Sequence, residues 1–366
     1  MSSFKETIEQ DSVKNYFLHG FVLVDVDGAS LNNWGKDSTN TQGMDNTTAV
    51  KKVFKNGRTY AVVSGQAWRY WWREALGLNG WSLSPVTRDT KVAFTDANPV
   101  KYADDDIFGY MRASKEIEKD TAGEIVVDNK GKPKKVDVSV TRVSPLKNSI
   151  LTSVTPVRIA NEFSSMTRQD GDVVPYEKQA YSAVLKGIFS LDLDQTGTFT
   201  KINRSGYKNI TESAYQEILN NNGKEVSDLI NPNIKRARLD IDTRRKRAKD
   251  TLIALKTIAG GAKRATNYVS VKPDFIILAV LKGGNNIFDN VAVDDDGRAT
   301  ISLKAIEDSI KDNKEYFRSD VYIGKATGFM EDTHIKIQDI EGVSIKVGSV
   351  NAIIDEFVKV FDTVIL

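Results

Sequence analysis

The chain has 366 residues, 40% of them hydrophobic, with no cysteine and with 51 Lys plus Arg against 49 Asp plus Glu. This length allows two average domains or one domain with large insertions, and the hydrophobic content argues against wholesale disorder. The lack of cysteine excludes disulfides, thiolate zinc sites and a cysteine nucleophile, and a net charge of +2 does not by itself indicate a nucleic-acid partner. No apolar run approaches the roughly 18 residues of a membrane span, and the start "MSSFKETIEQ" is too polar for a signal peptide, so we expect a cytoplasmic protein without a membrane partner.

The first half of the chain predicts strands, loops and helices in alternation. The run "YFLHGFVLVDVDG" (16–28) predicts a central strand, and the loop after it is rich in Asn, Ser, Thr and Gly. A short strand at 58–65 leads into a helix that starts near Ser64 and ends in "LGLNG" (76–80). Beyond it, 104–119 is predicted to be helical and 123–140 to be a hairpin with a basic turn, in a stretch typical of an insertion.

The second half continues the mixture. Residues 149–166 and 180–193 predict strands on either side of a polar loop at 167–179. Helices are expected near 211–220 and 242–259, the second closed by "GGAKRATN" (260–267). Two strands are expected around Pro273, a hairpin around the Asp-Asp-Gly of "VAVDDDGRATISL", and amphipathic helices at "LKAIEDSIKDN" and "NAIIDEFVKVFD".

Strands and helices therefore interleave without a regular βα period. This favours an α+β fold with helices packed on one face of a mostly antiparallel sheet. A ferredoxin-like (RRM-type) palm with insertions fits best. A doubly wound sheet with a nucleotide site fits less well, because no Gly-rich motif follows a strand in the required context.

The helical segment "SGQAWRYWWREAL" (64–76) has two chemically different faces. At the helical period its three tryptophans share one wide face with Leu76, which predicts a buried stripe. The opposite arc carries Gln66, Arg69 and Arg73. Like charges four residues apart cost a few tenths of a kcal/mol. The arginines are therefore either a solvated face or a pair of guanidinium forks spaced to hold phosphates.

A second basic segment, "TRRKRAK" (243–249), opens the next long helix. Cations are disfavoured at a helix N-terminus, so their presence indicates either an external anion, a partner's acids or a solvated charged face. In the following "GGAKRATN", two glycines permit a close backbone approach beside Lys263 and Arg264.

Carboxylates offer a different hypothesis. Asp25 and Asp27 alternate on a strand and project from one face. On a palm-type sheet such a pair could bind two metals in a ribonuclease or nucleotidyltransferase, although strand-end acids entering a loop are the simpler interpretation. The acidic triplets at 104–106 and 294–296 lack the spacing of a calcium loop and indicate turns or helix N-termini. No metal or other cofactor is predicted. His19 and His334, the only histidines, belong to no catalytic motif.

Several segments occur in a recognisable order: "HGFVLVDVDGASLNNWG", "SGQAWRYWWREAL", "DIFGYMRA", "SPLKNS" and "IAGGAKRATNYVSVKPDFIILAV". Together they resemble the backbone subunit of the CRISPR-associated Cascade complex, in the DevR or Cst-type branch of the Cas seven family (RAMP superfamily) of type I-B systems. The resemblance covers most of the chain and rests on the order and spacing of the segments.

This resemblance implies a non-enzymatic protein whose copies stack along a guide RNA (crRNA) and present its bases to target DNA. The implied partners are neighbouring copies, a Cas five-type subunit, a large subunit and the guide-processing endonuclease. The implied domains are an RRM-like palm (1–80, 146–163 and 185–366), a fingers insertion (81–145) and a protruding thumb hairpin (164–184). Type III relatives cut target RNA with an aspartate in the loop after the first strand, and Asp27 or Asp37 lies in that vicinity here. The DevR-like motifs favour the non-cutting branch, and a metal-dependent ribonuclease or nucleotidyltransferase using Asp25, Asp27 or Asp37 is the alternative.

The resemblance also implies RNA contacts at individual positions. The implied backbone contacts are Asn32, Asn33, Lys36, Gln66, Arg69, Arg73, Gly260, Gly261, Lys263 and Arg264. In the thumb, Phe163 or Met166 would wedge between bases, with Arg168 and Lys178 beside it. The acidic triplets could supply a surface on which neighbouring copies dock.

Overall fold

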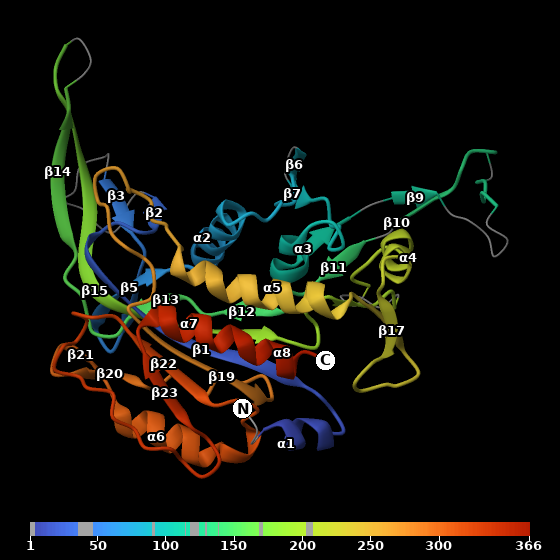
Figure 1. Ribbon diagram of the computed structural model, residues 1–366. Helices are drawn as coiled ribbons and strands as arrows, with labels where there is room; N and C mark the ends of the chain where they lie inside the picture. Colours follow the sequence, from blue (N-terminus) through green and yellow to red (C-terminus); the bar gives the residue numbers. More distant parts are fainter. Residues whose placement is uncertain are drawn as a thin grey trace. The chain divides into compact units, whose positions relative to one another are not determined.

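The computed structural model describes residues 4–35, 47–89, 92–113, 115–117, 124–128, 130–137, 139–167, 171–202 and 208–366. The chain forms two compact units (Figure 1). Unit 1 comprises Met1–Asn79, Lys147–Leu191 and Lys249–Val364, and unit 2 comprises Gly80–Leu146, Asp192–Ala248 and Ile365–Leu366. None of the described helices is long and apolar enough to span a membrane.

Unit 1 is built on a mixed sheet that, in the described residues, has 12 strands. The strands are β1 (Tyr16–Ala29), β2 (Asn33–Gly35), β3 (Thr47–Val50), β4 (Lys52–Lys55), β5 (Arg58–Val63), β12 (Leu146–Asn148), β13 (Leu151–Ser153), β14 (Ala160–Met166), β15 (Val174–Asp192), β19 (Phe275–Lys282), β22 (Val321–Lys325) and β23 (Ile345–Gly348). Their main order is β23-β22-β19-β1-β15-β13-β5-β4. The pairs β1–β19, β19–β22, β13–β15 and β14–β15 are antiparallel, whereas β22–β23 and β3–β15 are parallel.

Helices and a hairpin complete unit 1. They are α1 (Lys5–Gln10), α2 (Gly65–Leu78), the end of α5 (Ile241–Ile253), η1 (Ala254–Lys256), β20 (Ala292–Asp295), β21 (Arg298–Ile301), α6 (Leu303–Asp312), η2 (Lys314–Tyr316), α7 (Val350–Phe357), η3 (Val358–Val360) and α8 (Phe361–Val364). The predicted Asp-Asp-Gly hairpin is confirmed by the antiparallel pairing of β20 with β21.

Both faces of the central strands are covered, which explains the continuous apolar run of β19. Phe275 and Ile277 of β19 pack in one core cluster with Ile306 and Ile310 of α6. On the other face of the sheet, the ring of Tyr322 meets Phe357 of α7 edge to face at 5.1 Å. A strand buried on both faces is apolar at successive positions rather than alternate ones. The expectation that all helices cover one face is therefore wrong.

His19 lies on β1 and is completely buried. Its Nε2 lies 2.9 Å from the carbonyl oxygen of Gly283, and its Nδ1 has no hydrogen-bond partner. Burial lowers the pKa of His19 below its usual range, and the nearby charge of Lys147 lowers it further. The folded protein therefore holds His19 neutral as the pH falls below about 6.5, where the unfolded chain binds a proton.

We expect the free energy of unfolding to decrease as the pH falls below about 6.5, by up to about 1.4 kcal/mol per pH unit, until the lowered folded-state pKa is reached. Urea titrations from pH 7.5 to 5 measure this slope. His19→Leu should flatten it, because the substituted side chain cannot titrate. His334→Gln, which removes the other histidine of the chain, is the matched control. An equally steep slope in His19→Leu contradicts the assignment.

Unit 2 is made of small sheets and short helices. Its described elements are β6 (Val86–Asp89), β7 (Val92–Thr95), α3 (Ala103–Phe108), β8 (Tyr110–Arg112), β9 (Lys115–Ile117), β10 (Lys135–Asp137), β11 (Val140–Arg142), β16 (Thr198–Phe199), α4 (Glu212–Asn220), β17 (Lys224–Ser227), β18 (Lys235–Arg238) and most of α5. Its larger apolar cluster is formed by α4 packing on β16 and β18, through residues such as Tyr215, Ile218 and Phe199.

Several predicted elements differ from the observed ones. The predicted helix at 104–119 ends at Phe108, where Gly109 takes a positive φ of 74°, and the chain continues as β8 and β9. Of the two strands expected around Pro273, only β19 forms. The helix expected to reach residue 259 ends at Ile253 and continues as the 3₁₀ turn η1. The loop expected at 167–179 is shorter, because β15 already begins at Val174.

Candidate nucleic-acid interface

Helix α2 is held against the sheet of unit 1 by its tryptophan stripe. Ser64 caps the helix, its Oγ accepting from the backbone N–H of Ala67 at 3.3 Å. Trp68 and Trp72 both meet the ring of Phe189 on β15 edge to face, at 6.4 and 5.2 Å. Phe189 itself fills the space above Gly20 of β1, where a Cβ would lie 2.1 Å from its ring. The predicted core role of the tryptophans is confirmed.

The same stripe positions the segment after η1. The Trp72 indole N–H donates to the carbonyl oxygen of Thr251 at 2.7 Å. Trp71 packs on Gly260, where a Cβ would lie 2.1 Å from the indole ring. Gly260 is therefore required for contact with this tryptophan. The paired glycines were expected to let the backbone approach a ligand closely. At Gly260 the close neighbour is instead Trp71 of the same chain.

The polar face of α2 is less uniform than its spacing predicts. Gln66 is exposed, but Arg69 and Arg73 are only partly exposed. The Arg69 Nη1 donates to Oδ1 of Asn148 at 3.0 Å. Burial lowers the pKa of Arg69 to about 10, so the guanidinium stays charged at neutral pH. The expectation that both arginines face outward is corrected: Asn148 holds Arg69 against the sheet.

Three segments that are distant in sequence meet at the N-terminus of α2. Asn32, after β1, accepts from the backbone N–H of Ser64 through its Oδ1 at 2.9 Å. The backbone N–H of Ala262 donates to the carbonyl oxygen of Ser30 at 3.2 Å. We call the exposed or partly exposed polar residues of this region the candidate interface: Asn32, Asn33, Gln66, Lys263 and Arg264.

Asn267 ties the loop that carries Lys263 and Arg264 to two strands. Its Nδ2 donates to the carbonyl oxygen of Gly28 at 2.9 Å, and its Oδ1 accepts from Lys178 Nζ at 3.1 Å. Lys178 on β15 is buried and also pairs with Glu162 at 3.1 Å. The ammonium of Lys178 is thus engaged within unit 1, although it was expected to flank an RNA-binding thumb. Sequence patterns did not indicate these roles of Asn267 and Asn148.

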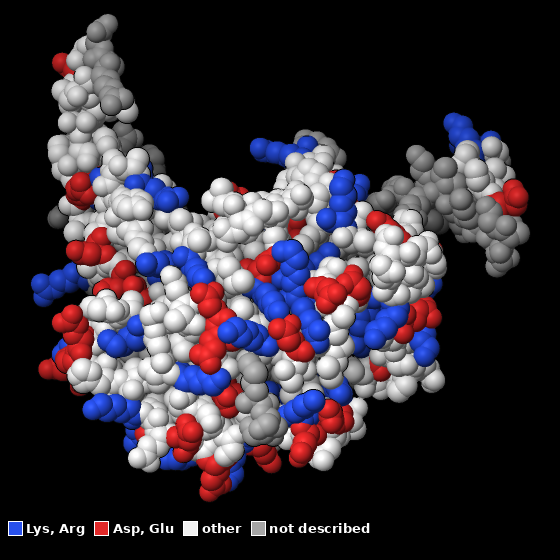
Figure 2. Space-filling model, viewed as in Figure 1, with Lys and Arg blue, Asp and Glu red and all other residues white. Residues whose placement is uncertain are grey.

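Strands β14 and β15 form a hairpin that extends away from the rest of unit 1 (Figure 1). Phe163 and Met166 are 66% and 58% exposed, and Val173 and Val174 beside them are exposed too. Figure 2 shows few charges on the visible side of this hairpin. An extended, apolar hairpin end is consistent with a wedge. Lys36, Asp37 and Arg168 lie outside the described residues.

The carboxylates at the end of β1 lie near a third acid. Asp25 and Asp27 are both exposed, and Asp27 accepts a hydrogen bond from the Ser182 hydroxyl. The Asp25 backbone N–H donates to Oδ2 of Asp274 at 2.9 Å. Burial and the neighbouring Asp27 raise the pKa of Asp25. Among the described residues, no group of three or more acids and histidines is arranged to hold a metal ion.

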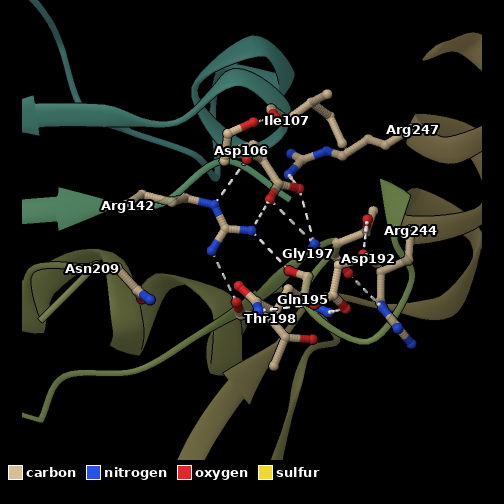
Figure 3. Close-up of polar contacts among 12 residues, drawn as sticks. Asp106, Ile107, Arg142, Asp192, Gln195, Gly197, Thr198, Asn209, Arg244 and Arg247 are labelled. Carbon is tan, nitrogen blue, oxygen red and sulfur yellow. Dashed lines mark hydrogen bonds and ion pairs between the residues drawn. The ribbon is translucent and has the colours of Figure 1, made fainter. Parts of the chain in front are cut away.

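In unit 2, charged side chains of 104–106 and 243–249, which were expected to face a ligand, a partner or solvent, instead contact one another (Figure 3). Asp106 is completely buried and accepts from Arg247 Nη1 at 2.7 Å, from the Gly197 backbone N–H at 2.9 Å, and from Arg142. Arg244, also buried, donates to the carbonyl oxygens of Thr196 and Leu193, each at 2.8 Å. These two arginines of the basic helix therefore bind internal acceptors.

The acidic triplet at 104–106 likewise has internal partners. Asp104 accepts from the backbone N–H of Ser84 at 3.0 Å, and Asp105 accepts from that of Asn98 at 2.9 Å. All three aspartates are buried in the first turn of α3. The predicted helix N-terminus is confirmed, whereas a docking surface made by this triplet is ruled out by its burial. Figure 2 shows acids and bases interspersed over the visible face.

A solved structure shares this mixed α+β fold. One chain of a structure titled "CRISPR RNA-guided surveillance complex, pre-nicking" matches with a TM-score of 0.52 at 11% identity, covering 94% of this chain and 99% of that one. A chain titled "CRISPR RNA-guided surveillance complex" matches with a TM-score of 0.48 at 12% identity, over 94% and 98% of the two chains. No curated protein matches by sequence.

The family model for the CRISPR-associated negative auto-regulator DevR/Csa2 matches residues 21–296. The match includes β1 from Phe21 onward, α2, the β14–β15 hairpin, the loop after η1 and β19. The chain belongs to the DevR/Csa2 family, which confirms the predicted resemblance.

Proposed function

We propose that this chain is a non-catalytic backbone subunit of a CRISPR Cascade surveillance complex, binding guide RNA in the cytoplasm. The observation that carries the proposal is the DevR/Csa2 family match over residues 21–296. The type I-B assignment and the assembly of copies into a helical filament along the guide are finer parts of the same proposal. So are the Cas five-type, large-subunit and guide-processing endonuclease partners, and the pairing of the exposed bases with target DNA.

The candidate interface supports this role through its chemistry. Amides and cations from three segments lie at one end of α2, and each segment is fixed by hydrogen bonds. Such groups hold a phosphate backbone without reading its sequence. In the proposal Lys36, Arg69, Arg73 and Gly261 complete the track, Phe163 or Met166 wedges between bases with Arg168 beside it, and Lys178 braces the loop through Asn267. Gly260, expected beside Gly261, is buried against Trp71 and is left out of the track.

The proposed domains follow the family pattern. Unit 1 contains the thumb hairpin and the proposed RRM-like palm except for residues 192–248 and the last two residues, and Gly80–Leu146 of unit 2 has nearly the bounds of the proposed fingers. Residues 192–248, first expected in the palm, fold with unit 2.

Reversing two interface charges tests the proposal. Lys263→Glu with Arg264→Glu should weaken binding to a short unstructured RNA by about tenfold or more, because two phosphate contacts become repulsive. The slope of log affinity against log salt should decrease in magnitude by about 1.4. Fluorescence anisotropy at several salt concentrations measures both quantities. The matched control is Lys304→Glu with Lys311→Glu, on the exposed side of α6 in the same unit.

Unchanged RNA affinity in the interface variant, or equal loss in the control, contradicts the proposed site. The same preparations incubated with RNA and Mg²⁺ or Mn²⁺ address the ribonuclease alternative. RNA cleavage that is abolished by Asp27→Ala would replace the scaffold proposal with a metal-dependent enzyme.

A further inference from the structure

The loop between η1 and β19 holds one exposed aromatic residue between two fixed points. Before it, Asn267 is bonded to Gly28 and Lys178, and its backbone N–H donates to the carbonyl oxygen of Lys263 at 2.8 Å. After it, Val271 is 3% exposed. The backbone of Tyr268 is therefore held in place on both sides.

The side chain of Tyr268 is nevertheless 77% exposed. The aromatic ring is largely apolar, so leaving it exposed loses the stabilisation that its burial would give. The same loop exposes two cations, Arg264 and Lys272. Proteins bind single-stranded nucleic acids with exposed rings and cations on the same surface: the ring stacks on a base and the cations bind the phosphates.

Asn267 connects this loop to one face of the thumb hairpin, β14–β15. Lys178 contacts both Asn267 of the loop and Glu162 of β14. Because side chains of a strand alternate between its faces, Met166 lies on the same face of β14 as Glu162, about 13 Å further along the strand. Phe163 lies on the opposite face. Asn267, the residue before Tyr268, therefore meets the hairpin on the face that carries Met166.

We propose that Tyr268 is a stacking platform for one nucleobase of the bound guide RNA, with Arg264 and Lys272 on the phosphates that flank it. The inference rests on the proposed RNA-binding function and adds a residue to it. Stacking tolerates every base, because each base has a π-face. The platform therefore suits a protein that must bind guides of any sequence. Met166, on the hairpin face that Asn267 approaches through Lys178, would bound the adjoining stretch of RNA.

The test compares Tyr268→Ala, Tyr268→Phe and wild type for binding to a fluorescein-labelled, unstructured single-stranded RNA. We expect Tyr268→Ala to weaken binding about tenfold and Tyr268→Phe to bind like wild type, because the ring and not the hydroxyl stacks. The dependence of affinity on salt should stay unchanged in both variants, since no charge is lost. Tyr316→Ala, which truncates another exposed tyrosine of unit 1, is the matched control.

The outcomes separate this inference from the function on which it rests. Wild type that does not bind RNA overturns both. Wild type that binds RNA while Tyr268→Ala binds equally well overturns the stacking role alone. The same holds if Tyr268→Ala keeps its RNA affinity and instead weakens self-association in sedimentation, which would assign Tyr268 to a protein contact. Ultraviolet crosslinking of the wild-type complex, followed by peptide mapping, should place a nucleotide on Tyr268.

Discussion

Replacing Asp106 by alanine should destabilise unit 2 by about 3–5 kcal/mol, the cost of breaking a buried ion pair by removing one partner. The carboxylate is completely buried and is shared by Arg142 and Arg247, which are themselves 2% and 6% exposed. Removing it takes away the carboxylate that these two buried guanidinium groups share. It also leaves the Gly197 backbone N–H without its acceptor.

Urea denaturation, with amide hydrogen exchange of α3 and β11 as a local readout, measures this loss. Asp106→Asn keeps the shape of the side chain and should lose less stability than Asp106→Ala, because one acceptor oxygen remains. Asp308→Ala is the control: it removes an exposed i,i+4 partner of Lys304 and should change stability by less than about 0.5 kcal/mol. An Asp106→Ala loss as small as that of the control contradicts a structural role for the network.

The buried network also shows where the sequence was insufficient. The residues that satisfy Asp106 come from positions 142, 197 and 247, so no local pattern reveals them. The local pattern of "TRRKRAK" indicates a helix start with unfavourable charge, and each of the three interpretations of that pattern placed its arginines at a surface. In the structure, Arg244 and Arg247 reach the loop after β15 and the first turn of α3, and their charges are satisfied there.

The helical period of apolar residues, by contrast, was sufficient to predict which face of a helix is buried. The spacing of the tryptophans predicted the buried face of α2, because a helix presents residues three and four apart to one side. The same reasoning failed on the opposite face. Spacing cannot show that Asn148, more than 70 residues further on, draws Arg69 inward. It also cannot show that Gly260 is glycine because Trp71 lies against it.

The second large effect is expected at Trp72. Trp72→Ala should destabilise unit 1 by about 3–5 kcal/mol, since it empties the space of a completely buried indole. Trp72→Phe should cost less, because the ring contact with Phe189 can persist while the N–H donated to Thr251 is lost. The carbonyl oxygen of Thr251 then loses the donor of a hydrogen bond worth about 1 kcal/mol. Urea denaturation curves of the two variants measure the difference.

Gln66→Ala completes the comparison by altering the other face of the same helix. Gln66 is exposed, so this variant should keep its stability within about 0.5 kcal/mol. It should weaken RNA binding, because the amide belongs to the candidate interface. Trp72→Phe, assayed under conditions in which it is fully folded, should bind RNA like wild type. If instead Trp72→Phe loses RNA affinity while Gln66→Ala does not, the tryptophan face of α2 contacts RNA. The proposal that the tryptophan face packs in the core and the polar face binds RNA is then wrong.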